Sequence, residues 1–255
     1  MEQEEAKIKS LGRALRVLEC FTTQHPEWGV TELATLLDMN KSNVFNIMAT
    51  FQRSGYVEKL PNGKYTLGLK MLEYAFTINQ HLGYPNAVYD IMVEAAAQTE
   101  EIVYFGVPHG QNVLYLYVAH PASRMAVLPY RDMLGEKAPL YATGIGKAIL
   151  AQIPESEWAS RIPEERPRYT PNSMTDYDEV VEELRRTRTR GFAIDNTERE
   201  PGVRCVGVPV YNTNGQMVAG MSTSGPAANM TDEKLLRCSE ILLNAALRMK
   251  ERIYR

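Results

Sequence analysis

Apolar positions in the first quarter of the chain recur at the three- and four-residue spacing of amphipathic helices. Two short runs rich in strand-forming residues follow, separated by the turn-forming Pro61-Asn62-Gly63. The pattern predicts three helices and a hairpin, at residues 10–21, 31–37, 40–55, 56–59 and 64–67. Two short helices joined by a tight turn, with a helix before them and a hairpin after them, make a winged helix-turn-helix.

Short polar residues and a glycine mark the expected ends of these helices. Ser10 can cap the first helix, either Asn40 or Ser42 can cap the third, and Gly55 ends it. The apolar stripes predict a shared core formed by Leu11, Ala14, Leu15, Leu18, Phe21, Leu33, Leu36, Leu37, Val44, Ile47, Met48 and Phe51.

The third helix keeps a mostly polar face away from that core. This face presents Lys41, Ser42, Asn43, Phe45, Asn46 and Thr50. Amides, hydroxyls and an ammonium suit base edges and phosphates, whereas the alternative is a solvated face on a small helical domain. We expect the face to enter the major groove of double-stranded DNA, and we expect phosphates to be reached by Arg13, Thr31 and Lys64.

The rest of the chain predicts a linker helix and then a second domain. The helix runs over 68–82, and Gly83-Tyr84-Pro85 ends it. Beyond it we expect helices at 86–99, 145–152, 175–191 and 231–253, and strands at 102–107, 112–118, 124–130, 203–211 and 216–223. Thr175 with Asp178 resembles a capping box. Hairpins dominate, so the fold class is α+β with an antiparallel sheet, and the predicted organisation is 1–67, 68–82 and 83–255.

The hairpin at 203–223 is the most informative segment of the second domain. A type I′ turn at Asn214-Gly215 would pair Thr213 with Gln216 and fix the register of every later pair. One face then carries the apolar residues Val206, Val208, Val210, Ala219 and Met221. The other face carries the small or polar residues Cys205, Gly207, Gly220, Ser222 and Ser224. The second face leaves room either for a ligand or for a closely packed helix.

Two further segments carry groups that suit a ligand. Gly144-Ile145-Gly146 opens a helix with glycines where its first N–H groups would point, which suits a small anion. Asp195 lies in an expected loop over 195–202, where it could accept from a ligand hydroxyl or form an Asx turn.

Composition and charge narrow the class of protein. The 255 residues are 44% apolar and 23% charged, which is typical of a globular chain. The formal net charge is −3, yet residues 7–67 hold eight basic and five acidic residues, so the first domain is mildly basic. No apolar run is long enough to span a membrane and the first residues are acidic, so we expect a soluble, cytoplasmic protein with no membrane partner. The three cysteines form no CxxC pair, which excludes a disulfide framework and an ordinary structural zinc site.

Motifs along nearly the whole chain resemble the IclR family of bacterial transcriptional regulators. The resemblance rests on SLGRALRVLE (10–19), TELA (31–34), KSNVF (41–45), SGYV (54–57), YTLG (65–68), ATGIGKA (142–148), RGFAID (190–195) and PGVRC (201–205). It implies a winged helix-turn-helix, a linker helix and a GAF-like effector domain. It also implies a homodimer or homotetramer on a palindromic operator, commonly as a repressor.

The resemblance further implies a site for a small organic acid. In the family the effector meets the positions that match Gly144, Ile145, Asp195, Cys205, Ser222 and Ser224. The chain departs from the family at Asn46, where arginine is frequent, and at Asn196, where a second acidic residue is frequent. Because Asp195 would repel a carboxylate, we expect it to accept from a hydroxyl, which favours a hydroxy or sugar acid.

Two other classes of function compete with an effector-responsive regulator. An enzyme could use Cys205 as a nucleophile, but none of the four histidines lies near it in the predicted hairpin or the glycine-led helix. A metal sensor could use Cys205 with Asp195 or Glu198, but it would lack a clear set of histidine ligands. We therefore expect no catalytic residue, no cofactor and no metal.

Overall fold

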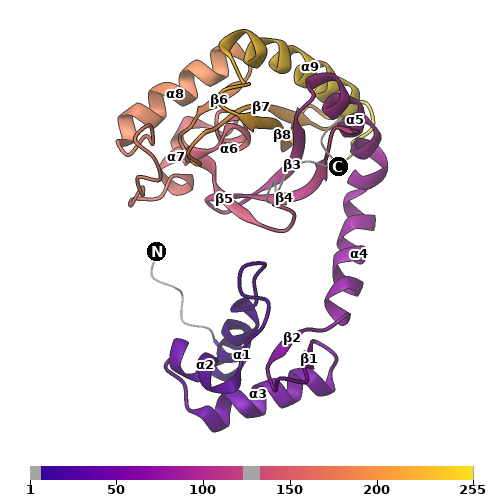
Figure 1. The fold of residues 1–255 in the computed structure, drawn as a ribbon, viewed down its shortest axis with the longest axis vertical. Coiled ribbons are helices and arrows are strands. Elements are labelled where there is room, and N and C mark those ends of the chain that lie inside the picture. The colour runs from indigo at the N-terminus through magenta and orange to yellow at the C-terminus, as the bar shows by residue number, and fades with distance from the viewer. Residues whose placement is uncertain (1–6, 123–132, 255) are drawn as a thin grey trace. The chain divides into compact units, whose positions relative to one another are not determined.

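The computed structural model describes residues 7–122 and 133–254, and the strand expected at 124–130 lies outside them. The chain divides into two compact units, Met1–His81 and Leu82–Arg255 (Figure 1). Each unit has its own hydrophobic core. None of the helices in the described ranges is both long and apolar enough to cross a bilayer.

The first unit is a winged helix-turn-helix, as the sequence predicts. Its elements are α1 (Lys9–Glu19), α2 (Val30–Leu36), α3 (Lys41–Arg53), β1 (Val57–Lys59), β2 (Tyr65–Leu67) and α4 (Lys70–Leu82). The strands pair antiparallel with Val57 opposite Leu67. The buried core comprises Val17, Phe21, Leu33, Val44, Met48, Val57 and Tyr65. In contrast, no residue of α4 is buried.

Some expected details of α1 and α2 are wrong. Leu11, Leu15 and Leu36 are 53%, 48% and 57% exposed, whereas Val17 is fully buried. Helix α1 carries two overlapping apolar stripes that share Ala14 and Leu18, and spacing alone cannot choose between them. The stripe that contains Val17 is the one that faces the core.

The caps of α1 and α3 also differ in how well they were predicted. Ser10 lies inside α1, whose N-cap position is Ile8 and has no side-chain hydrogen bond. Asn40, one of the two alternatives, caps α3: its Oδ1 accepts from the Ser42 N–H at 2.9 Å. Gly55 follows α3 with φ of +78°, a conformation that glycine adopts without strain.

The second unit is built on a six-stranded antiparallel sheet with strand order β5-β4-β3-β8-β7-β6. The strands are β3 (Ile102–His109), β4 (Asn112–Ala119), β5 (Lys137–Pro139), β6 (Ala193–Asn196), β7 (Val203–Tyr211) and β8 (Met217–Pro226). The helices are α5 (Tyr84–Thr99), α6 (Gly144–Leu150), α7 (Glu155–Arg161), α8 (Tyr177–Arg190) and α9 (Asp232–Lys250), with a 3₁₀ turn at Leu140–Ala142. This confirms the α+β class.

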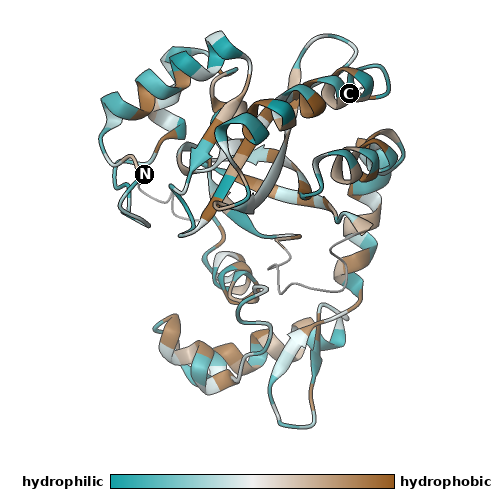
Figure 2. Cartoon of the chain, turned by 45° about the horizontal axis from the view of Figure 1, so that its top comes forward, coloured by the Kyte–Doolittle hydropathy of each residue, from teal (hydrophilic) through white to brown (hydrophobic). Residues whose placement is uncertain are grey.

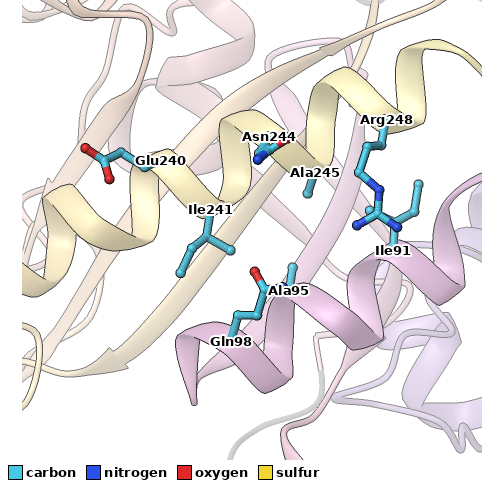
Figure 3. Close-up of a pocket in the computed structure, with 8 residues that line it drawn as sticks. All are labelled: Ile91, Ala95, Gln98, Glu240, Ile241, Asn244, Ala245 and Arg248. Carbon is cyan, nitrogen blue, oxygen red and sulfur yellow. The ribbon is translucent and has the colours of Figure 1, made fainter.

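Helices cover both faces of this sheet (Figure 1). Helices α5 and α9 pack on the face that carries the predicted apolar set from Val206 to Met221. Helices α6, α7 and α8 belong to the core on the other face. Figure 2 shows hydrophobic residues along the strands and along the helices around them. A groove of about 230 Å³ runs between α5 and α9, bordered by Gln98, Glu240 and Arg248 among others (Figure 3).

The β7–β8 register is as predicted, although the turn is not. Gly207 faces Ser222 and Cys205 faces Ser224. Only Gly215 of the turn has a positive φ, so a type I′ turn is excluded, and its N–H donates to the Asn212 carbonyl at 3.0 Å. Next to the turn, Tyr211 pairs with Met217. A bulge between Tyr211 and Val210 then shifts the pairing by one residue, so Val210 pairs with Ala219 and the rest of the hairpin has the expected register.

The sequence pattern did not predict strands β5 and β6, helix α7 or the N-cap of helix α8. Strands β5 and β6 have three and four residues, too few for alternation to be visible, and α7 lies in the proline-rich passage. Asp195 therefore lies in a strand, opposite Cys205, rather than in a loop. Helix α8 is capped by Asp176, not by Thr175. Asp176 Oδ1 accepts from the backbone N–H groups of Asp178 and Glu179, at 2.8 and 3.2 Å.

Candidate functional site

The small-residue face of the β7–β8 hairpin serves two purposes. Over its middle, α6 packs so closely that a Cβ at Gly207 would collide with the Gly144 backbone, and one at Gly220 would lie 2.9 Å from Ile145 Cγ1. The glycines are thus explained by helix packing, the alternative that the sequence left open. The serines and the cysteine lie beyond the start of α6, where the face borders a pocket.

The pocket has a volume of about 70 Å³ and brings residues together from β3, β4, α6, β6, β7, β8 and nearby loops. It is lined by Tyr104, Tyr115, Met133, Thr143, Gly144, Ile145, Asp195, Arg199, Glu200, Val203, Cys205, Ser222 and Ser224. All six effector positions implied by the family resemblance lie in this list. The tyrosine rings of Tyr104 and Tyr115 pack edge to face with centroids 5.6 Å apart.

Sequence reasoning missed the tyrosines, Arg199 and Glu200. Tyr104 lies directly opposite Ser222 across the β3–β8 pair, so strand alternation would have placed it on the pocket face once that pairing was known. No local signal predicts a pairing between strands so distant in sequence. Arg199 and Glu200 lie in the segment expected to be a loop.

The start of α6 is already partly satisfied by the chain itself. Thr143 is the N-cap, and its Oγ1 accepts from the Gly146 N–H at 3.1 Å. That amide is therefore not available to an anion, contrary to the expectation that the helix start leaves its donors free.

The thiol and hydroxyls of the hairpin form the polar wall of the pocket. Ser224 donates to Cys205 Sγ at 2.9 Å. Burial, followed by the charge of Asp195, raises the pKa of the Cys205 thiol well above its ordinary value, so the nucleophilic thiolate is disfavoured. Ser222 is 3% exposed, and its hydroxyl has no hydrogen-bond partner within residues 7–122 and 133–254.

Asp195 is a buried carboxyl, 3% exposed, at the end of the pocket formed by β6. Its Oδ1 accepts from the Glu198 N–H at 2.7 Å, so it makes a local turn contact and still lines the pocket. Burial and then the charge of Glu198 raise the pKa of Asp195 from 3.8 to about 7, and nearby Lys147 acts in the opposite direction. Asp195 therefore holds its proton to a higher pH than an exposed aspartate does.

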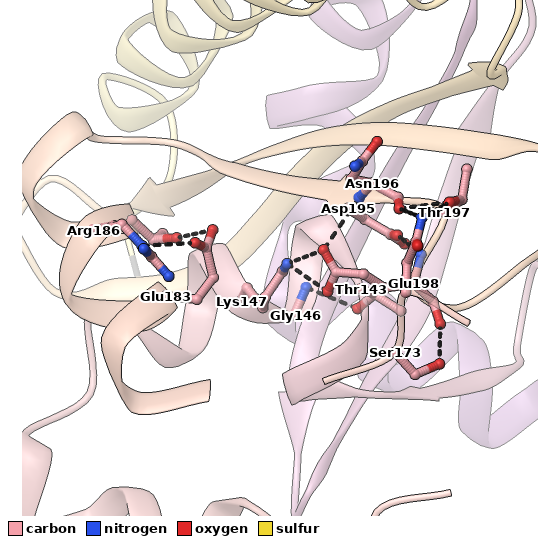
Figure 4. Close-up of polar contacts among 12 residues, drawn as sticks. Thr143, Gly146, Lys147, Ser173, Glu183, Arg186, Asp195, Asn196, Thr197 and Glu198 are labelled. Atoms are coloured by element: carbon pink, nitrogen blue, oxygen red, sulfur yellow. Dashed lines mark hydrogen bonds and ion pairs between the residues drawn. The ribbon is translucent and has the colours of Figure 1, made fainter. Parts of the chain in front are cut away.

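A buried ion pair lies behind the pocket (Figure 4). Lys147 Nζ is 2.6 and 2.7 Å from the two carboxylate oxygens of Glu198, and the two residues are 0% and 4% exposed. The Glu198 carbonyl accepts from Ser173 Oγ at 2.7 Å, which ties the β6–β7 segment to the chain before α8. The only sequence signal for the pair was a lysine in the otherwise apolar and glycine-rich α6.

The first unit presents the predicted recognition face to solvent. On α3 the exposed residues include Lys41, Ser42, Asn43, Phe45, Asn46 and Thr50. Arg13 and Asn43 border one hollow, together with Arg16, which sequence reasoning did not single out. Thr31 is exposed at the start of α2. Lys64 Nζ lies 2.8 Å from Glu32 Oε1, so its ammonium forms an exposed ion pair in the absence of DNA.

The described ranges contain no group of three histidine, cysteine or acidic side chains that could hold a metal ion. Cys205 and Asp195 face each other across β7 and β6, but no third ligand of these types joins them in the part of the chain that the structure describes.

A winged helix-turn-helix unit followed by an α+β unit with a pocket that carries several polar side chains defines a DNA-binding regulator with a ligand-binding domain. The chain matches the family descriptions "IclR helix-turn-helix domain" over residues 10–61 and "Bacterial transcriptional regulator IclR C-terminal" over residues 81–251. It belongs to the IclR family of bacterial transcriptional regulators.

Individual relatives agree with this assignment. The HTH-type transcriptional regulator XynR of Escherichia coli is 29% identical over 242 residues, which cover 94% of this chain and 95% of XynR. The crystal structure of the Thermotoga maritima IclR has a TM-score of 0.73 and 31% identity, covering 96% of this chain and 99% of that one. An IclR homologue from Microbacterium hydrocarbonoxydans, solved in complex with 4-hydroxybenzoate, has a TM-score of 0.80 and 22% identity, covering 94% and 97%. The curated relatives are regulators of transcription, not enzymes.

Proposed function

We propose that this protein is a transcriptional repressor that binds a palindromic operator as a homodimer or homotetramer and is released or modulated by a small organic acid. The observation that carries the proposal is the pocket of the second unit, which Asp195, Cys205, Ser222 and Ser224 line together. A regulator without an effector would have no need to keep polar groups around a cavity.

The DNA side of the proposal rests on α3. Its polar residues are exposed, and Asn43 lies beside Arg13, which is well placed to bind a phosphate next to the bases that Asn43 would contact. Helix α3 has a single arginine, Arg53, in its last turn, so each half-site is expected to bind modestly and two copies are needed.

Exposed apolar side chains support self-association. Leu72 and Phe76 on α4 are 51% and 65% exposed, and Leu11 and Leu15 on α1 are about as exposed. Large apolar residues gathered on a surface are typical of sites that bind another protein chain. A second copy with two-fold symmetry would match a palindromic operator.

The pocket suits an acid that also carries a hydroxyl. The hydroxyl of Ser222 can donate to a carboxylate, that of Ser224 can do so by turning away from Cys205 Sγ, and Asp195 can accept from a hydroxyl at the other end of the ligand. The 4-hydroxybenzoate bound by the Microbacterium relative combines the same two groups. A hydroxy or sugar acid is therefore the class of effector that we expect here.

A thermal-shift screen against hydroxy and sugar acids tests this proposal. A ligand that binds only the folded state at 100 times its Kd raises the free energy of unfolding by about 2.7 kcal/mol. Ser222→Ala and Ser224→Ala should weaken binding of any hit by about tenfold or more, the value of one charge-assisted hydrogen bond. Ser239→Ala, which removes a buried hydroxyl of α9 outside the pocket, is the matched control and should leave binding unchanged. Hits that bind both pocket variants as tightly as the parent would place the effector elsewhere.

A further inference from the structure

Arg199 lies in the pocket wall in an unusual state. Its guanidinium carbon is 4.2 Å from the centroid of the Tyr169 ring, so the planar group is stacked on the ring. Its Nε is buried and has no hydrogen-bond partner, and its side chain forms no ion pair or hydrogen bond with any residue of the described ranges. Stacking uses the face of the guanidinium and leaves the N–H donors along its edge unused.

The other half-buried arginines of the second unit show how differently Arg199 is placed. In the part of the chain that the structure describes, each of the others donates to a carbonyl or a carboxylate: Arg161, Arg166, Arg190 and Arg204. Leaving a partly buried cation without a partner is unfavourable for folding, so such a group is typical of a binding site that a ligand completes.

Among the described residues that line the pocket, Arg199 is the cation without a partner. Lys147 is fully engaged by Glu198 behind the wall. The remaining charged residues of the lining are Asp195 and Glu200, both acidic. Without Arg199 the pocket would repel an anion, and hydroxyl donors alone would accept a neutral ligand equally well.

We infer that Arg199 is the residue that makes this pocket select carboxylates over neutral molecules of the same shape, by pairing its guanidinium edge with the carboxylate of the effector. Tyr169 is its positioning residue, because the ring fixes the plane in which the guanidinium presents its donors. The inference rests on the proposed function, since it names the group that recognises the acid. Arg199 lines the same pocket as the hydroxyls of Ser222 and Ser224.

Matched pairs of carboxylates and their amides test the inference on the full-length protein. The probes are acetate and acetamide, lactate and lactamide, and 4-hydroxybenzoate and 4-hydroxybenzamide, each titrated while the Tm is followed. At least one carboxylate should raise the Tm of the parent at concentrations where its amide does not. Arg199→Gln should weaken that carboxylate by about tenfold or more. Arg237→Gln, which removes an exposed arginine from α9, controls for the change in net charge and should have no effect.

Two further variants separate a binding role from a structural one. Tyr169→Leu should weaken the carboxylate as Arg199→Gln does, and Tyr169→Phe should restore it because the ring is kept. Without any ligand, the Tm of Arg199→Gln should equal or exceed that of the parent, since an unsatisfied cation has been removed. A Tm below that of the parent would mean that Arg199 is structural and would overturn the inference.

The remaining outcomes distinguish the inference from the function on which it rests. If no carboxylate stabilises the parent more than Arg199→Gln, or if amides bind as tightly as acids, the inference is wrong, even if a neutral effector still occupies the pocket. If a carboxylate binds in an Arg199-dependent way but does not change operator binding, the inference stands and the proposed function fails.

Discussion

Replacing Asp195 by asparagine should change how the stability of the second unit depends on pH. In the folded chain the pKa of Asp195 is raised from 3.8 to about 7, chiefly by burial and by the charge of Glu198. The unfolded chain releases this proton near pH 4, and the folded chain keeps it until about pH 7. Between these values the folded state binds more protons, so this group lowers the free energy of unfolding as pH rises.

The size of the effect follows from the same two values. The difference between a pKa of 3.8 in the unfolded chain and about 7 in the folded chain lowers the free energy of unfolding by at most about 4 kcal/mol, at 1.36 kcal/mol per pKa unit. Lys147 and Glu198 readjust when Asp195 ionises, so an observed effect of about 1–4 kcal/mol is expected. Asp195→Asn keeps an oxygen that can accept from the Glu198 N–H and cannot ionise. Because the unfolded carboxyl ionises near 3.8, the variant should already be the more stable protein at pH 5, and its advantage over the parent should grow by up to about 3 kcal/mol between pH 5 and pH 8.

Urea unfolding at pH 5, 6, 7 and 8 measures this difference. The chain has two tryptophans, so Trp28→Phe leaves Trp158, buried in the second unit, as the only fluorescent reporter of that kind. Asn196→Ala, next to Asp195 on β6, changes an exposed side chain that does not titrate and serves as the control. If the curves for Asp195→Asn and the parent stay parallel from pH 5 to pH 8, the carboxyl titrates at its ordinary value and the account of this site is wrong.

Three other changes have definite expected outcomes. Lys147→Met leaves a buried carboxylate without its partner and should lower the free energy of unfolding by roughly 3–5 kcal/mol in the same urea assay; a loss below about 1 kcal/mol would contradict a dry ion pair. Asn43→Ala should change the base preference recovered by selection from random duplexes, whereas Lys64→Ala should weaken all selected sites alike and reduce the salt dependence of binding; equal effects of both on preference would refute the separation of roles. A fragment of residues 83–255 should stay folded by circular dichroism and keep the ligand, and limited proteolysis of the full chain should cut near Gly83; an unfolded fragment would place the boundary elsewhere.

Local patterns predicted the elements whose signals are strong and short-range. The helices of the first unit, Gly55 after α3 and the two faces of the β7–β8 hairpin all follow from spacing and turn residues. In the hairpin two errors offset each other: the actual turn sets a register one residue away from the predicted one, and the missed bulge between Val210 and Tyr211 shifts it back. Pattern alone did not choose which stripe of α1 faces the core.

The pocket was predictable only in part. Cys205, Ser222 and Ser224 were identified because strand register and the family resemblance both point to the same face, whereas Asp195 was expected in a loop and was implied by the resemblance. Tyr104 joins them through pairing between β3 and β8, which depends on the whole sheet. Arg199 could not be found from sequence because its significance is that no described residue pairs with it, which only the folded chain shows.

The central claim is that occupancy of this pocket controls DNA binding. Its most direct test is the fluorescence anisotropy of a labelled palindrome, obtained by selection with the full-length protein, titrated with a carboxylate that stabilises the protein. The parent should be released from the duplex as the carboxylate saturates it, and Ser222→Ala should bind the duplex normally but need about ten times more carboxylate for release. If the parent stays bound at saturation, or if Ser222→Ala is released at the same concentration as the parent, the pocket does not control the operator.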